Sequence, residues 1–90
     1  QALDYYNRSV ELKSQTNDKE GLTYTLANLA KLHISIKQPQ KALEFAEKSL
    51  KISEEISAKA RVRDASLILA ETYSNLQNYQ KAYQYYQVYM

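Results

Sequence analysis

The stretch QKALEFAEKSLKI, residues 40–52, decides the fold because the chain contains it in three versions. A near copy, QALDYYNRSVEL, covers residues 1–12, and a shorter one, QKAYQYYQVYM, covers residues 80–90. The three copies align without a gap on a period of 40 residues, which is marked by Ala2, Ala42 and Ala82. A fixed period of this length indicates a repeat architecture, in which each copy performs the same packing task.

Composition narrows the class of protein. The chain has 90 residues, enough for one small domain, with a single glycine, Gly21, and a single proline, Pro39. So few helix breakers favour long helices joined by short turns. Cysteine is absent, which excludes disulfides, and the 12 basic and 10 acidic residues are interleaved, so we expect no nucleic-acid surface. No apolar run is long enough for membrane insertion of this segment.

Apolar residues recur at helical intervals in every segment, and alternation with period two is missing. We expect Asn17 to cap the second helix, with Glu20 at the spacing of a capping box. Pro39 suits the first turn of the third helix, and Ser57 is the expected cap of the fourth. Gln77 and Asn78 form the last turn. The pattern predicts five helices near residues 2–15, 18–36, 40–56, 59–76 and 79–90.

The same periodicity predicts which side chains face inward. They are Leu22, Leu26, Leu29, Ala30, His33 and Ile36; Ala42, Leu43, Ala46, Ser49, Leu50 and Ile56; and Val62, Leu69, Ala70, Tyr73 and Leu76. The sole histidine, His33, is expected to pack, because no second ligand or nucleophile is spaced to join it. Tyr86 and Tyr89 align with packing positions, so we expect them to pack against a following helix; the alternative is an aromatic binding surface.

The order of large and small residues resembles the tetratricopeptide repeat. The first helix of that family carries a large residue, then leucine and a small residue, then tyrosine, and the second carries small residues that let helices approach closely. These positions are Leu26, Leu29, Ala30 and His33; Ser66, Leu69, Ala70 and Tyr73; and Ala42, Ala46 and Ser49. The resemblance implies an all-α fold, an α-solenoid of antiparallel helix pairs with about two and a half repeats.

In this reading the chain is a single domain and an excerpt of a longer protein. Residues 1–16 form the second helix of a truncated repeat, residues 17–56 a full repeat, and residues 57–90 a full or nearly full one. The period is longer than is usual for the family, and Ser14 and Glu54 replace the proline that normally ends the second helix. Repeats extended in this way resemble those of bacterial sensor histidine kinases and related signalling regulators, in the cytoplasm or the periplasm.

The resemblance implies a protein or peptide partner, no catalysis and no cofactor. First helices of neighbouring repeats line a groove, and helical spacing places on that face Tyr24, Asn28, Lys31, Ser35, Asp64, Ile68, Glu71 and Asn75. A rival interpretation is a structural spacer, or a homo-oligomerisation module that self-associates through exposed repeat ends, at Tyr85, Val88 and Tyr89 for the last helix. An enzyme is the third class, and the missing pairing of a nucleophile with a base argues against it.

Overall fold

The computed structural model describes residues 2–15 and 18–89, and it describes side chains for residues 4–12 and 18–88. Every element in the described part of the chain is an α-helix. The helices are α1 (Ala2–Gln15), α2 (Lys19–Ser35), α3 (Pro39–Glu55), α4 (Lys59–Asn75) and α5 (Tyr79–Tyr89). The bounds predicted from the apolar period are therefore confirmed to within one residue at each end.

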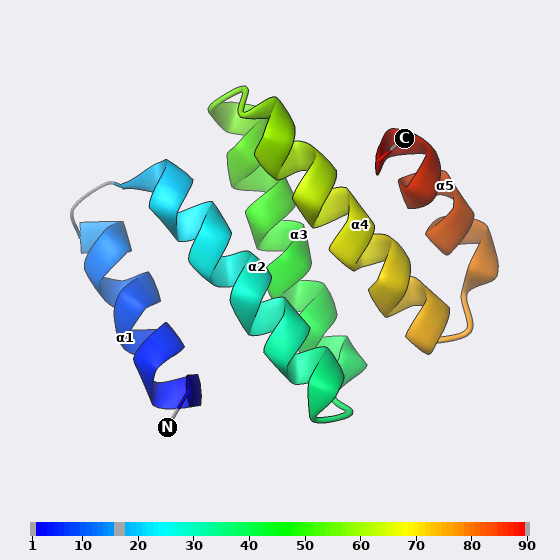
Figure 1. Cartoon of the computed structure of the whole chain (residues 1–90), viewed down its shortest axis with the longest axis horizontal. Helices are drawn as coiled ribbons and strands as arrows, with labels where there is room; N and C mark the ends of the chain where they lie inside the picture. Colours follow the sequence, from blue (N-terminus) through cyan, green and yellow to red (C-terminus); the bar gives the residue numbers. More distant parts are fainter. Residues whose placement is uncertain (1, 16–17, 90) are drawn as a thin grey trace.

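The helices follow one another across the molecule from α1 at one edge to α5 at the other, and α3 passes behind α2 and α4 (Figure 1). Each helix packs against the next one in the chain, and α2 also lies against α4. The result is a slab with extents of 37 × 30 × 14 Å. This arrangement confirms the predicted all-α solenoid of helix pairs, in which the contact between α2 and α4 joins consecutive first helices into one face.

The start of α2 differs from the prediction by one residue. Asp18 is the N-cap, and its Oδ1 accepts a hydrogen bond of 3.0 Å from the backbone N–H of Gly21. The predicted cap, Asn17, lies outside the described residues. Asp18 also explains the single glycine of the chain, because a Cβ at position 21 would lie 2.5 Å from Asp18 Oδ2. Pro39 occupies the first turn of α3, as predicted, where its missing N–H costs no hydrogen bond.

Three helices end in the same way, at intervals of 20 residues. Lys37, Ser57 and Gln77 have φ values of 64°, 55° and 62°, in the left-handed region. In the first turn the N–H of Gln38 donates to the carbonyl of His33 and the N–H of Lys37 to that of Ile34, which is the hydrogen-bond pattern of a Schellman motif. The corresponding two bonds close the other two turns.

This motif overturns the prediction that Ser57 caps α4. Ser57 belongs to the end of α3, where its backbone adopts the left-handed conformation. The N-cap of α4 is Ala58, which offers no side-chain acceptor to the first turn. The sequence pattern misled because serine is a favoured N-cap residue, whereas the turn geometry requires the cap one residue later.

The core is built on small residues at the helix contacts. Ala30, Ala42, Ala46 and Ala70 are fully buried and let the helices approach closely, while Leu29, Ile68, Leu69 and Tyr73 fill the space beside them. A buried hydrogen bond of 2.9 Å, from Ser49 Oγ to the carbonyl of Thr23, ties α3 to α2. A bond of this kind contributes roughly 1 kcal/mol net to the free energy of unfolding.

Not every residue predicted to face inward is buried. Ile36 is 47% exposed, and it is the C-cap residue that follows the last turn of α2. Six further residues predicted to face inward are half-buried: Leu22, Leu43, Leu50, Ile56, Val62 and Leu76. Tyr85, expected at an exposed end, is half-buried and stacks on Tyr73 with ring centroids 5.7 Å apart. The side chain of Tyr89 lies outside the described residues.

Candidate functional site

The face formed by α2 and α4 holds two adjoining hollows. The smaller, about 130 Å³, lies between the two helices, and its lining includes Tyr24, Asn28, Asp64 and Ile68. The larger, about 520 Å³, continues toward α5. Lys31 and Leu67 line both, so the two form one concave surface that crosses consecutive first helices. We call this surface the α2–α4 groove.

Seven of the eight residues that helical spacing placed on this face line one of the two hollows. Lys31, Glu71 and Asn75 border the larger, and Tyr24, Asn28, Asp64 and Ile68 the smaller, which Lys31 also reaches. Ser35 lines neither hollow, because its hydroxyl turns back to donate a hydrogen bond of 2.7 Å to the carbonyl of Leu32. Ile68 is only 2% exposed, so it forms the floor of the groove and offers little surface to a partner.

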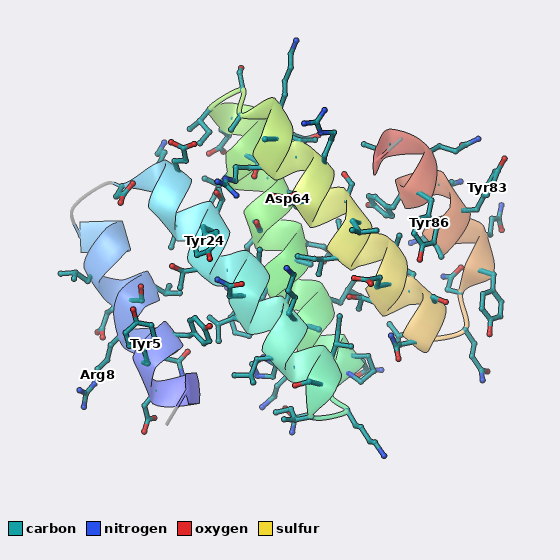
Figure 2. The ribbon with its side chains drawn as sticks, viewed as in Figure 1. Tyr5, Arg8, Tyr24, Asp64, Tyr83 and Tyr86 are labelled. Atoms are coloured by element: carbon teal, nitrogen blue, oxygen red, sulfur yellow. The ribbon has the colours of Figure 1, made fainter. Side chains whose placement is uncertain are left out.

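A polar bridge crosses the smaller hollow from α4 to α2. The guanidinium of Arg61 forms an ion pair with Asp64, at 3.2 Å, and lies over the ring of Tyr24, 5.5 Å from its centroid. Tyr24 and Asp64 project from neighbouring helices on the same face of the molecule (Figure 2). Asp64 thus has a charged partner within the protein, although its side chain remains 54% exposed.

The larger hollow has an apolar wall, and two of its residues, Ile34 and Tyr86, were not among those that helical spacing placed on this face. Ile34 of α2, Leu67 of α4 and Tyr86 of α5 line it, together with Ser74. Tyr86 is 37% exposed, and it projects on the same side of the molecule as Tyr24 (Figure 2). Tyr86 belongs to a second helix, outside the face that helical spacing marked. The signal in the sequence was the aromatic binding surface, the alternative to packing for Tyr86 and Tyr89.

The two asparagines of the groove, Asn28 and Asn75, differ in their side-chain hydrogen bonds. Asn75 donates through Nδ2 to the backbone carbonyl of Glu71, at 2.8 Å, within its own helix. Asn28 is half-buried in the smaller hollow, and its amide forms no side-chain hydrogen bond with a described residue. Of the two asparagines, Asn28 is therefore the one with both donor and acceptor available to a partner.

Comparison with known protein families agrees with this architecture. The tetratricopeptide repeat profile matches residues 1–55, and a second profile of the same repeat matches residues 65–89. The chain belongs to the tetratricopeptide repeat family. Tetratricopeptide repeats generally mediate protein–protein interaction or scaffolding, and the family typically consists of non-catalytic interaction modules. No curated protein and no solved structure is similar enough to this chain to be matched.

The aromatic residues of these tetratricopeptide repeats pack in pairs at equivalent positions. His33 stacks on Phe45, with ring centroids 5.1 Å apart, as Tyr73 stacks on Tyr85 one period later. His33 is 5% exposed, and its Nδ1 lies 2.9 Å from the carbonyl of Leu29, which fixes the proton on Nδ1 as a donor. His33 thus serves the packing between α2 and α3.

The two stacked tyrosines, Tyr73 and Tyr85, also have raised pKa values. Burial raises the pKa of Tyr73 above its usual value of 10.0, and the charge of Glu47 adds to the effect. Burial likewise raises the pKa of Tyr85, with further contributions from Tyr73 and Glu47 and an opposing one from Lys81. Both phenols therefore stay neutral to a higher pH in the folded repeat than in an unfolded chain.

The described residues lack the side-chain cluster that a metal centre would need. They contain no group of three or more histidine, cysteine, aspartate or glutamate side chains that could hold a metal ion. Over the same residues, no helix has both the length and the apolarity needed to cross a membrane. The α2–α4 groove, which crosses two consecutive first helices, is the candidate functional site.

Proposed function

We propose that this chain is a module that binds an extended peptide segment of a protein partner in the α2–α4 groove. The observation that carries the proposal is the continuity of the two hollows across consecutive first helices, through Lys31 and Leu67. A ligand lying across both helices would bury apolar surface against Ile34 and Leu67. It would also meet the free amide of Asn28, which can pair with a peptide backbone.

Random-peptide display on the immobilised chain supplies ligands for a test. Selected peptides would be labelled, and their dissociation constants measured by fluorescence anisotropy. Asn28→Ala should weaken binding by about fivefold, since a net backbone hydrogen bond contributes roughly 1 kcal/mol. Lys31→Ala should weaken it as well. Both variants should melt like the parent, because Lys31 is exposed and Asn28 lies at the edge of the packed face.

Glu44→Ala and Lys48→Ala provide matched controls on the outer side of α3. Both residues are exposed, and neither lines the α2–α4 groove. If these two variants abolish binding while Asn28→Ala and Lys31→Ala bind like the parent, the partner docks on the outer face and the groove proposal is wrong.

The setting we propose is the sensory or scaffolding region of a bacterial signalling protein, such as a two-component sensor kinase. Support comes from the 40-residue period, since extended repeats of this kind resemble those that precede kinase or DNA-binding modules. Sequencing the gene around this segment tests the setting. A membrane-spanning segment or a kinase module next to the repeats would support it, and an unrelated catalytic domain would contradict it.

A second candidate function is homo-oligomerisation, which the surface of α5 favours. Tyr79 and Tyr83 are each 64% exposed, and Val88 is 53% exposed. Tyr83 projects from the side of α5 that faces away from α4 (Figure 2). Exposed apolar faces at the ends of repeat arrays lower solubility unless they are covered. In this alternative the chain holds an attached domain in an assembly and the groove has no dedicated ligand.

A further inference from the structure

The larger hollow of the α2–α4 groove carries two charges that the protein does not neutralise. Lys31 and Glu71 both line it and both are exposed. Among the described residues, neither forms an ion pair, whereas Arg61 and Asp64 at the other end of the groove are paired with each other. Lys31 and Glu71 are therefore the unpaired charges of this hollow that a ligand can contact.

These two charges occupy the same register position in consecutive repeats. They are 40 residues apart, so Lys31 stands on α2 where Glu71 stands on α4. Because α2 lies against α4, a ligand that crosses from one first helix to the next meets a positive charge and then a negative one. Packed helix axes are about 8–10 Å apart, and an extended chain advances about 3.3 Å per residue. The two charges can therefore contact ligand residues that are two or three positions apart along an extended segment.

An apolar surface lies in the same hollow. Ile34 and Leu67 are half-buried there, and the ring of Tyr86 forms a wall from α5. The volume of about 520 Å³ is open to solvent and holds a short peptide segment more readily than a single side chain. An apolar side chain of the ligand could contact these three residues while its neighbours approach the charges.

We infer that the partner presents an extended segment in which one acidic and one basic side chain flank an apolar residue. The acidic side chain pairs with Lys31 and the basic side chain with Glu71. A uniformly acidic segment would be repelled at Glu71, and a uniformly basic one at Lys31, so the groove discriminates by sign as well as by shape. This inference rests on the proposed peptide-binding function and specifies the chemistry of its ligand.

The test is charge reversal combined with selection from a random heptapeptide display library. Peptides selected on the parent chain should carry one acidic and one basic residue, two or three positions apart, with an apolar residue between them. Lys31→Glu should bind these peptides several-fold to about tenfold more weakly, since it replaces an attraction between exposed charges with a repulsion. A new selection on Lys31→Glu should lose the acidic residue, and a selection on Glu71→Lys should lose the basic one.

Lys37→Glu is the matched control for charge reversal. Lys37 is an exposed lysine in the turn after α2 and lines neither hollow, so this variant changes the net charge of the chain by the same amount. It should bind the parent's peptides with unchanged affinity. Thermal melting should give similar curves for all the reversed variants, because each altered side chain is exposed.

The binding results for these variants distinguish the inferred charge pattern of the ligand from the proposed peptide-binding function. If the selected peptides lose affinity with Asn28→Ala but not with Lys31→Glu or Glu71→Lys, the groove binds peptides and the charge pattern is wrong. If they are insensitive to all three changes, the proposed groove function fails and this inference fails with it. Failure of the library to yield any binder would count against both.

Discussion

At the scale of single residues, the buried hydroxyls fall into two groups. Most are paired: Thr23 Oγ1 donates to the carbonyl of Glu20 at 2.7 Å, and Ser49 Oγ donates to that of Thr23. Ser66 is the exception, because it is fully buried and its Oγ has no hydrogen-bond partner among the described residues. It stands one period after Leu26, so a polar atom occupies a position that is apolar in the preceding repeat.

Ser66→Ala should therefore stabilise the protein. Burying a hydroxyl without a partner costs about 1–3 kcal/mol, and alanine removes that cost with a small change in volume. We expect the free energy of unfolding, measured in urea, to rise by about 1 kcal/mol. Ser49→Ala is the matched control and should lower it by a similar amount, because it breaks the bond to Thr23. Equal effects of the two changes would show that Ser66 has a partner in solution.

The raised pKa values of Tyr73 and Tyr85 predict a loss of stability at alkaline pH. An unfolded chain releases these phenolic protons near pH 10.0, whereas the folded repeat keeps them to a higher pH. Above the unfolded pKa the unfolded state binds fewer protons, so the free energy of unfolding falls as pH rises. The stability that the two neutral phenols contribute should be fully present below the unfolded pKa and should be lost as the pH rises through the folded pKa.

Melting temperatures measured across this alkaline range would test whether the free energy of unfolding falls as the pH rises. Tyr73→Phe should lose less stability than the parent as the pH rises, because phenylalanine has no proton to release. Tyr79→Phe removes an exposed tyrosine from the same part of the chain and should leave the alkaline profile of the parent nearly unchanged. A profile for Tyr73→Phe as steep as that of the parent would assign the alkaline transition to other groups.

At the scale of elements, the three helix turns share one backbone conformation without glycine. A residue other than glycine in the left-handed region costs about 1–2 kcal/mol, partly offset by the greater freedom that glycine has when unfolded. Lys37→Gly should therefore raise the free energy of unfolding by about 0.5–1 kcal/mol. Lys41→Gly, at an exposed position in the first turn of α3, should lower it instead, by up to about 1 kcal/mol.

Chemical denaturation of the two glycine variants measures both effects with the same substitution. The comparison isolates backbone conformation, since each change removes one exposed lysine side chain. If Lys37→Gly destabilises as much as Lys41→Gly, the turn after α2 does not hold the left-handed conformation in solution.

At the scale of the whole molecule, the slab leaves the outer side of α5 uncovered. On α3, the positions one period before Tyr83 and Tyr86 are Leu43 and Ala46, and both pack into the core. On α5 the equivalent residues are exposed instead, Tyr83 to 64% and Tyr86 to 37%, and so is Tyr79 one turn earlier. The repeat thus places apolar surface where the architecture normally covers it with a further helix.

We accordingly expect the isolated chain to self-associate as its concentration rises. Light scattering should show an increasing average mass, and the double change Tyr79→Ser with Tyr83→Ser should return the chain toward a monomer. Tyr24→Ser removes an exposed tyrosine from the concave face and should leave the association unchanged. A parent chain that stays monomeric over a wide range of concentration would contradict this prediction.

The sequence alone determines the helices, the period and the residues that share a face. Helix formation depends on spacing along the chain, so the apolar residues that recur around Leu29 and Leu69 place α2 and α4 to within one residue at each end. Pro39 marked the start of α3 by a local steric rule. The alignment of Lys31 with Glu71 is likewise a property of the 40-residue period.

Only the tertiary structure decided how each of these positions is used. Asn28 and Ile68 are equivalent in register, yet Asn28 is half-buried with a free amide and Ile68 is 2% exposed on the floor of the groove. The bridge from Arg61 to Tyr24 and the wall formed by Tyr86 join residues of different helices. The reason is physical: periodicity reports which face of a helix turns inward, whereas exposure and pairing depend on which neighbours the packed helices bring to each position.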